Sequence, residues 1–486
     1  VRNEAQLAMR LKGNRHVSPA PDTSYQFVAQ APTDLNTRPV VIGFGPCGIF
    51  AALMLAKMGF RPIVLERGKT VRQRTRDTWG LWRKSVLDPE SNVQFGEGGA
   101  GTFSDGKLYS QIKDPRFLGR KVMEEFVKAG APPEILYVAH PHIGTFKLVK
   151  VVENIREQIV ALGGEIRFEQ RVTDVQIEDG QLRGLTVLDQ ATGTSSELRA
   201  DQVVMALGHS SRDTFAMLHA RGVHIEAKPF SIGFRVEHPQ GLIDRARWGR
   251  HAGHPLLGAA DYKLVHHCKG DHGGNGRSVY SFCMCPGGTV VAATSEPNRV
   301  VTNGMSQYSR NERNANSGIV VGITPEVDYP GGPLAGIELQ ERLESHAFIL
   351  GGSDYKAPAQ LVGDFINDIP STELGEVEPS YKPGVALGDL ALALPDFAIE
   401  AIREALPAFE KQIRGYSLHD AVLTGIETRT SSPLRITRNE SLQSMNVKGL
   451  FPAGEGAGYA GGILSAGVDG IRIAEAVARD ILGLEA

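Results

Sequence analysis

A glycine-rich turn near the start of the chain constrains its fold more than any other feature of the sequence. Gly43-Phe44-Gly45-Pro46-Cys47-Gly48 follows the apolar run 40–42 and precedes the apolar, helix-favouring segment 49–58. A second apolar run, 62–65, leads into Glu66-Arg67. A strand, a Gly-x-Gly-x-x-Gly turn, a helix and a second strand with an acidic end form a Rossmann-type dinucleotide-binding unit. We therefore expect an α/β fold with a buried parallel sheet.

The residues of this turn have expected roles in holding a dinucleotide. Gly43 allows the tight turn, Gly45 lets the backbone approach a pyrophosphate, and Gly48 lets the helix pack against the strand. The start of the helix offers free N–H groups and the positive end of its dipole to the phosphates. Glu66 is expected to bind the adenosine ribose hydroxyls; the alternative is a glycine turn without a ligand. The expected binding residues are Gly43, Gly45, Pro46, Cys47, Gly48, Glu66 and Arg67, with Cys47 a small packing residue rather than a redox centre.

A second glycine-rich segment near the C-terminus has the same order of elements. The apolar run 450–453 leads into Gly454-Glu455-Gly456, and we expect a final helix over 463–481. The segment resembles the C-terminal flavin signature of the glutathione-reductase-like FAD superfamily. The resemblance implies that Glu455 hydrogen-bonds the ribityl chain and that the helix N-terminus points at the pyrimidine end of the flavin. The cofactor contacts that it implies are Gly454, Glu455, Gly461, Gly462 and Ile463.

The two glycine segments fit opposite ends of one ligand, so together they predict FAD as the cofactor. Two weaker similarities to the same superfamily agree. Val172 lies at the start of an expected strand, where the superfamily places a backbone contact to adenine. Ala206-Leu207-Gly208 is similar to its Ala-Thr-Gly motif, although Leu207 departs from it, and we expect Ala206 and Gly208 to line the site.

The loop 96–106 is dense in glycine, which costs backbone entropy on folding. A close approach to a large ligand would justify that cost, so we expect Gly98, Gly99 and Gly101 to contact the flavin. The alternative is a mobile surface loop.

Two cationic residues are the candidate catalytic groups. Lys107 follows the glycine loop directly and could stabilise reduced flavin or bind an anionic substrate; a solvated surface lysine is the alternative. Arg429 lies in the polar segment 427–432 and could clamp a carboxylate or phosphate with its planar guanidinium. The alternative for Arg429 is an arginine in an ion pair between domains.

Four segments of the chain, 96–108, 280–288, 303–306 and 425–433, together resemble one family of bacterial FAD-dependent dehydrogenases of undefined substrate. The similarity extends from Val40 over nearly the whole chain, and it implies FAD and an oxidoreductase activity without naming a substrate. Similar proteins carry a further small N-terminal domain, and this chain begins at Val1 rather than Met, so we expect residues upstream.

The pattern of expected elements divides the chain into an extension and two domains. Residues 1–37 read as a polar extension, and 38–213 with 425–486 as a discontinuous FAD-binding domain. Residues 214–424 alternate in polarity, which indicates a mixed α+β substrate domain with a largely antiparallel sheet. Within it we expect Pro286-Gly287-Gly288 to turn strand 278–285 into strand 289–294, and one helix over 395–406.

Composition and cysteine usage exclude several classes of protein. A net charge of -3 argues against a nucleic-acid partner. Four cysteines make no disulfide framework, and we find neither a signal peptide nor a membrane-spanning apolar stretch, so a cytoplasmic protein is expected. Cys283 and Cys285 are expected on one side of a strand as core thiols, and with 266–268 they match no standard zinc pattern, so we expect no metal.

The expected reaction is hydride transfer between flavin N5 and an unidentified small molecule. The chain has no second Gly-x-Gly-x-x-Gly in a βαβ setting, which argues against a dedicated NAD(P)H domain, although transient use of NAD(P)H stays open. It also has no Cys-x4-Cys, which argues against a redox-active cysteine pair beside the flavin. Two alternatives remain: a flavin monooxygenase, and a non-enzymatic or macromolecule-directed flavoprotein, for example one that modifies tRNA.

Overall fold

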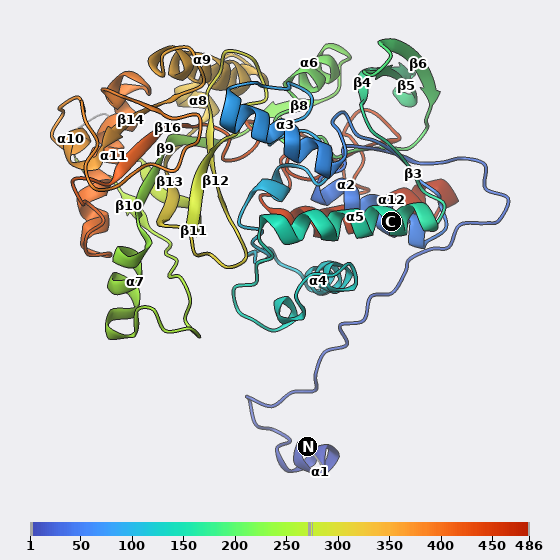
Figure 1. The fold of residues 1–486 in the computed structure, drawn as a ribbon. Helices are drawn as coiled ribbons and strands as arrows, with labels where there is room; N and C mark the ends of the chain where they lie inside the picture. Colours follow the sequence, from blue (N-terminus) through green and yellow to red (C-terminus); the bar gives the residue numbers. More distant parts are fainter. Residues whose placement is uncertain (1–2, 271–273, 275, 485–486) are drawn as a thin grey trace.

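A computed structural model describes residues 3–270, 274 and 276–484, so Val1 lies outside the described residues. A five-stranded sheet forms one half of the molecule (Figure 1). All its neighbouring strands pair in parallel, which confirms the α/β class and the parallel sheet. In spatial order its strands are β18 (Leu450–Pro452), β7 (Val203–Met205), β1 (Val40–Ile42), β2 (Ile63–Leu65) and β3 (Glu165–Arg167).

Both faces of this sheet are covered. Alternate residues such as Val41 and Val64 pack into a core with α2 (Pro46–Lys57), α5 (Thr145–Ala161) and α12 (Ile463–Leu482). Their neighbours, such as Val40 and Ile63, pack into a second core with a three-stranded antiparallel sheet. Double coverage explains why the four strands β1, β2, β7 and β18 are apolar and buried throughout, whereas the edge strand β3 is only partly buried. The covering sheet contains β4 (Gln170–Glu178), β5 (Gln181–Asp189) and β6 (Thr194–Arg199).

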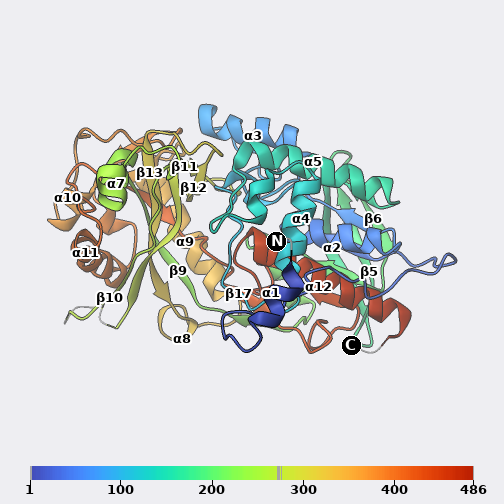
Figure 2. The same cartoon turned by 90° about the horizontal axis from the view of Figure 1, so that it is seen from below.

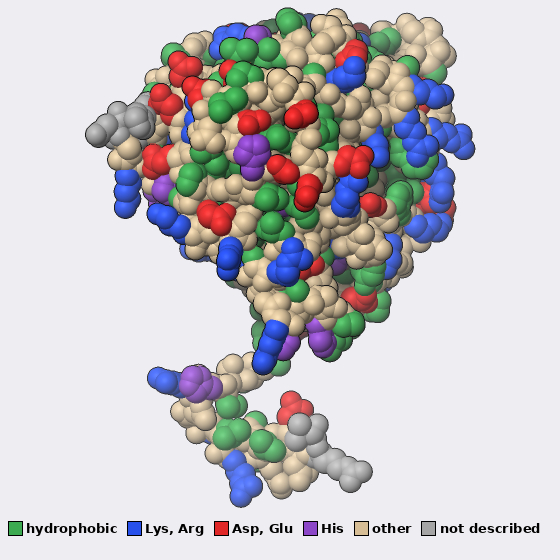
Figure 3. All heavy atoms as spheres, turned by 60° about the vertical axis from the view of Figure 1, so that its left-hand side comes forward, with side chains coloured by type: hydrophobic (Ala, Val, Ile, Leu, Met, Phe, Trp, Pro, Cys, Tyr) green, Lys and Arg blue, Asp and Glu red, His purple; other side chains and the backbone are tan. Residues whose placement is uncertain are grey.

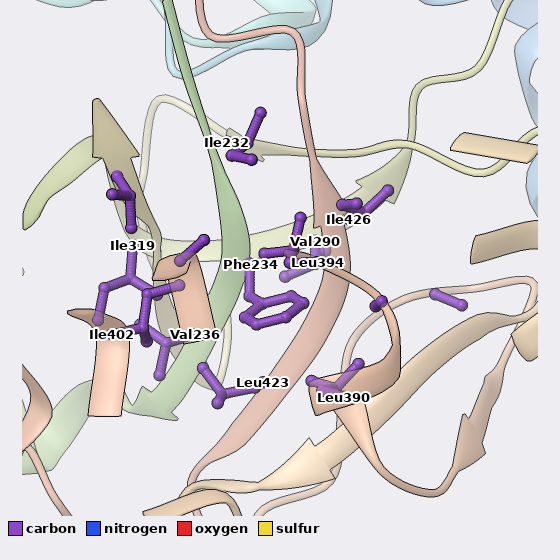
Figure 4. Close-up of a cluster of buried hydrophobic side chains, with 14 of the residues drawn as sticks. Ile232, Phe234, Val236, Val290, Ile319, Leu390, Leu394, Ile402, Leu423 and Ile426 are labelled. Atoms are coloured by element: carbon purple, nitrogen blue, oxygen red, sulfur yellow. The ribbon is translucent and has the colours of Figure 1, made fainter. Parts of the chain in front are cut away.

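An eight-stranded sheet forms the other half of the molecule (Figures 1 and 2). Among its described strand pairs only β14 and β15 run parallel, which confirms a largely antiparallel sheet in a mixed α+β region. Figure 4 shows part of its core, where Phe234 and Leu423 of the sheet and Ile402 of α11 (Asp396–Glu410) belong to one cluster of buried side chains. In spatial order the strands are β10 (Val265–His267), β11 (Ser278–Ala292), β13 (Asn314–Ile323), β9 (Phe230–Pro239), β16 (Val422–Glu427), β14 (Ala357–Leu361) and β15 (Val385–Leu387), with β12 (Thr302–Ser306) against β11.

The half with the eight-stranded sheet contains several helices, whereas the sequence predicts a single helix there. The expected helix is α11 (Asp396–Glu410), but α9 (Ala335–Leu350) was missed. The buried face of α9 includes Gln340 and Glu344, and these polar residues break the apolar periodicity on which the prediction depends. The remaining helices are α1 (Glu4–Arg10), α3 (Val71–Lys84), α4 (Leu118–Lys128), α6 (Arg212–Ala220), α7 (Gln240–Trp248), α8 (Pro325–Asp328) and α10 (Val362–Ile366), and strands β8 (Ile225–Ala227) and β17 (Leu434–Ile436) pair with each other.

The turn expected at Pro286-Gly287-Gly288 is wrong. β11 runs through these residues without reversing, and its register against β13 shifts between Phe282 and Cys285 and again between Cys285 and Gly288. Each shift absorbs one extra residue as a β-bulge. Glycine at position 287 allows the backbone of Arg310 to pack closely against it, because a Cβ at this position would overlap the carbonyl oxygen of Arg310.

The N-terminal segment projects from the body of the molecule (Figures 1 and 3). α1 buries none of its residues, whereas Tyr25 docks on the body and donates a hydrogen bond of 2.9 Å to Glu475 of α12. On the face drawn in Figure 3, the described cationic and anionic side chains are interspersed. Within the described ranges, none of the helices has the length and apolarity to span a bilayer.

Candidate functional site

A cavity of about 380 Å³ lies where the two halves of the molecule meet. Its volume is within the range of ligand and cofactor sites. One wall comes from the parallel-sheet half, through segments 42–47, 94–107, 206–211 and 453–466. The other wall comes from the eight-stranded sheet, through 282–283, 301–303 and 427–430.

The first glycine turn shapes one end of this cavity. Gly43 has φ +93°, and a Cβ there would overlap the carbonyl oxygen of Ala206. A Cβ at Gly48 would overlap the carbonyl oxygen of Gly43, so Gly48 serves helix packing and is not itself in the cavity wall. α2 begins at Pro46 without a side-chain cap, which leaves its first N–H groups and its positive dipole end for an anion.

The glycine loop packs directly on this turn. Gly98 donates a 2.8 Å hydrogen bond from its N–H to the carbonyl of Phe44, and a Cβ at Gly99 would lie 2.7 Å from the Cα of Gly45. Gly99 and Gly101 line the cavity, whereas Gly98 does not, because Thr102 lies against it. These contacts fix the loop beside the first turn and argue against a mobile surface loop.

Glu66 connects the two segments. Its carboxylate is 4% exposed and accepts hydrogen bonds from the N–H groups of Phe44 (2.8 Å), Gly68 (2.8 Å) and Gly96 (3.0 Å). A carboxylate can accept further bonds, so its expected contact with ribose stays a prediction. Its neighbour Arg67 lines the cavity while bound to Glu90 and Asp213.

The second glycine segment meets the first across the cavity. A Cβ at Gly454 would lie 2.9 Å from the Cβ of Cys47, and α12 packs along α2. The N–H of Gly454 donates to Asp469 at 2.8 Å, and Asp469 is in turn paired with Arg438, a support that sequence reasoning missed. α12 also begins without a side-chain cap. Two uncapped helix starts therefore converge on one cavity, which suits a ligand with two separate electron-rich regions.

The other expected cofactor contacts also line the cavity. Burial raises the pKa of Glu455 to about 7, an effect that Lys228 opposes and the nearby Cys283 reinforces. Near neutral pH Glu455 can therefore both donate and accept a hydrogen bond. The contacts in this set are Val172, Ala206, Gly208, Glu455, Gly461, Gly462 and Ile463.

Lys107 is held inside the cavity rather than solvated. Its side chain is 19% exposed, and its ammonium donates to the carbonyl of Met284 and lies 3.5 Å from Asp105. Burial opposes its charge, but Cys285 and Asp105 outweigh this effect and raise the pKa of Lys107 above its ordinary value. Lys107 is a fixed cation at the end of the cavity that both halves share.

Arg429 lines the cavity but is already engaged. Its guanidinium donates to Glu344 at 3.0 and 2.7 Å, and to Ser210 and Ser295 at 3.0 and 2.8 Å. Arg212 donates to the same Glu344 at 2.8 Å. These contacts are the ones that the ion-pair alternative expects, and a substrate anion would have to compete with Glu344.

Sequence reasoning missed two features of the cavity wall. The bulge in β11 breaks the strand alternation, so Cys283 lines the cavity while Cys285 is buried, and they are not two equivalent core thiols. His209 directly follows the Ala206-Leu207-Gly208 motif, which was a signal for it. Burial, assisted by the charges of Arg429 and Arg212, lowers its pKa to about 3, so it is a neutral imidazole.

One group of potential metal ligands occurs among the described residues, outside the cavity. One donor atom each of His266, Cys268 and Glu404 lies within 4.8 Å of the others. His266 is hydrogen-bonded to Glu404 at 2.8 Å, and the Cys268 thiol is directed at the carbonyl of Ala401 at 3.8 Å. Each donor therefore has a partner in the protein, and the expectation of no metal stays a prediction.

Comparisons with known proteins agree with this geometry. Residues 36–240 match the model of an FAD binding domain, and 229–430 match the model described as "FAD-dependent protein, C-terminal domain-like". An uncharacterised protein of Clostridium beijerinckii is 52% identical over 443 residues, which cover 91% of this chain and 81% of that protein. The cofactor is therefore FAD, and the glycine turns and helix starts described above fit it.

Two solved structures to which the chain is similar share little sequence identity with it. A flavoprotein/dehydrogenase from Cytophaga hutchinsonii has 13% identity and a TM-score of 0.39, covering 93% of this chain and 80% of that one. THI4 of Thermovibrio ammonificans has 18% identity and a TM-score of 0.27, covering 39% of this chain and 64% of that one. Likeness at this level says nothing about the reaction.

Proposed function

This chain belongs to a family of FAD-dependent proteins, and from that premise we propose that it is an oxidoreductase that transfers a hydride between flavin N5 and a small molecule. One observation carries the proposal: two uncapped helix starts, from opposite ends of the chain, converge on a cavity whose remaining wall comes from a different sheet. FAD, when bound, supplies the hydride chemistry, and the protein supplies position and charge.

The proposed binding mode assigns each helix start to one part of the cofactor. The N–H groups at the start of α2, with Gly45 and Gly99 beside them, would hold the pyrophosphate. The start of α12 would face the pyrimidine end of the flavin, where its dipole favours the negative charge of the reduced form. Glu455 would bind the ribityl chain and Val172 the adenine.

The wall from the eight-stranded sheet is the proposed substrate side. Lys107 belongs to the opposite wall, but its ammonium donates to the carbonyl of Met284 on β11 and so holds a fixed positive charge next to this side. It is paired with Asp105, which Arg310 also binds. This cation would hold an anionic group of a substrate or stabilise reduced flavin. The domain division at 38–213 with 425–486 and 214–424, membership in the glutathione-reductase-like superfamily, a cytoplasmic location and the absence of a nucleic-acid partner belong to the same proposal.

Anaerobic reduction of the purified yellow protein tests the proposal. NADH, NADPH and a panel of small metabolites are mixed with it in turn, and the flavin absorbance is followed. Bleaching by one compound names the class of donor. If dithionite bleaches the flavin and every other compound fails, a flavin-stabilised binding protein is the better account. A transient hydroperoxide absorbance on mixing the reduced protein with oxygen would favour a monooxygenase.

A further inference from the structure

Cys283 and Cys285 lie on β11 where this strand borders the cavity. Cys283 is in the cavity wall, and Cys285 is fully buried two residues further along the strand. Although the chain has no Cys-x4-Cys, which from sequence argued against a redox-active pair, we propose that these two thiols form a dithiol–disulfide couple that exchanges two electrons with the bound flavin. The inference rests on the proposed flavin site, because it requires the flavin in this cavity, but it does not depend on the identity of the substrate.

The thiol of Cys285 lies against the backbone of Cys283 in β11. In a regular strand, alternate Cα atoms are about 6.6 Å apart, near the upper limit for a disulfide. Here the three residues from Phe282 to Cys285 on β11 lie opposite only two residues of β13, which is a β-bulge. Within this bulge Cys283 has a left-handed backbone conformation, with φ +45°. The thiol of Cys285 lies 3.3 Å from the carbonyl oxygen of Cys283. A strained non-glycine backbone of this kind is concentrated at functional sites.

The charges around the bulge favour one thiolate and one thiol. Lys107 donates to the carbonyl of Met284, between the two cysteines, and Arg235 donates to the carbonyl of Cys283 at 3.1 Å. A hydrogen bond from Cys285, together with Lys107 and Arg235, lowers the pKa of Cys283 to about 5 against the opposing effect of burial. The hydrogen bond to Cys283 and burial raise the pKa of Cys285, so the proton stays there.

Anionic groups also face Cys283. Asp105 opposes the thiolate but is itself paired with Arg310 and Lys107, and Glu427 is paired with Arg235 at 2.9 Å. Because these carboxylates are themselves paired with cations, they oppose the Cys283 thiolate only weakly, and Lys107 and Arg235 stabilise it. A thiolate beside cations and in reach of a ligand is the reactive form of cysteine.

The electron transfer balances with no further reagent. In the oxidising direction, the S–H bond of Cys285 breaks and an S–S bond forms between Cys285 and the Cys283 thiolate. The two electrons and the proton of Cys285 pass to the oxidised flavin, which becomes the reduced anion. In the other direction the reduced flavin returns them and the S–S bond breaks.

The remaining two cysteines are placed differently. Cys47 lines the cavity from the first turn of α2, but burial, with the charge of Asp469, raises its pKa, so it remains a thiol. Cys268 is buried against Ala401 outside the cavity. Cys268→Ser is therefore a matched control that changes one buried thiol without touching the cavity wall.

Thiol counting on the wild-type holoenzyme tests the couple without any variant. The protein is oxidised with ferricyanide, denatured in an alkylating reagent and mapped by mass spectrometry, and a second sample is first reduced with dithionite. We expect two of the four cysteines, both in the peptide that carries 283–285, to escape alkylation only in the oxidised sample. Alkylation of all four cysteines in both samples would overturn the inference.

Anaerobic dithionite titration gives a second readout. Wild type and Cys268→Ser should take up about four electrons per flavin, two for FAD and two for the disulfide, whereas Cys283→Ser and Cys285→Ser should take up about two. Uptake of about two electrons by wild type would also overturn the couple. If the protein binds FAD and a metabolite reduces it, such a result leaves the proposed function standing; failure to take up FAD removes both proposals.

Discussion

The two walls of the cavity are built in different ways. On the parallel-sheet side, backbone forms most of the wall. It consists of the turns at Gly43 and Gly454, two helix starts and a glycine loop packed against them. On the side of the eight-stranded sheet, buried ion pairs support the wall, namely Arg235–Glu427 and Arg429–Glu344. The first wall is therefore shaped by positions where a side chain does not fit, and the second by charges that are buried in pairs. Substitutions behind or in each wall test this contrast.

The largest effect is expected at Glu344, which lies behind the side-chain wall and pairs with Arg429 of that wall. This buried carboxylate pairs with both Arg212 and Arg429, and they hold its pKa well below its usual range. Glu344→Ala leaves two buried guanidinium groups without their partner and should lower the free energy of unfolding by about 3–5 kcal/mol, measured by urea denaturation.

An exposed ion pair provides the matched comparison. In Arg313–Glu378 the side chains are 55% and 72% exposed, and Glu378→Gln should change the stability by less than about 0.5 kcal/mol. If Glu344→Ala were as mild as this, the buried network would not be what holds the second wall.

The next largest effect is expected at Gly48, where α2 packs behind the backbone wall. An added methyl group would overlap the carbonyl of Gly43, so Gly48→Ala should cost about 1–3 kcal/mol and release FAD, measured as the flavin-to-protein absorbance ratio. Gly241→Ala, in the first turn of α7 and facing only a flexible arginine end, should retain flavin. Equal flavin content in the two variants would mean that glycine sterics do not shape the cofactor site.

A smaller loss is expected at Glu66. Glu66→Gln replaces a carboxylate that accepts three backbone N–H groups with an amide that carries only one acceptor oxygen, at a cost of about 2 kcal/mol and with weaker FAD retention. Thermal release of flavin fluorescence measures both. A melting temperature unchanged from wild type would show that these hydrogen bonds do not hold the glycine loop.

The smallest effect concerns pH. The pKa of Glu455 is raised from 4.5 to about 7 in the folded protein, so the folded state holds this proton more tightly than the unfolded state. Its contribution to stability is fully present below pH 4.5 and is lost as pH rises through about 7. Because Glu455 is only half-buried, we expect a change of about 1 kcal/mol relative to Glu455→Gln. Parallel pH profiles of the two proteins would contradict the shift.

The backbone wall was predictable from sequence, and the side-chain wall was not. The turn 43–48 is recognisable from its glycines, which stand at a fixed spacing between two apolar runs. This pattern lies within a short stretch of sequence. Arg212, Glu344 and Arg429 meet only in the folded chain, and no spacing among them predicts their pairing. The same pairing concealed α9, whose buried face carries Glu344.

Irregular strands explain the remaining errors. Pro286-Gly287-Gly288 was expected to form a turn because these residue types favour turns, but the pairing of β11 with β12 and β13 carries the strand through them. The resulting bulges place Cys283 in the cavity, where strict alternation had predicted a core thiol. Bulge positions depend on the register of partner strands, which the local sequence does not encode.

The flavin content of the purified protein shows whether the two glycine segments hold FAD. We expect a yellow protein with equimolar FAD, identified by its mass after release, and recovery of FAD by the stripped protein at the same ratio. A colourless protein that takes up no FAD when the cofactor is supplied would contradict it.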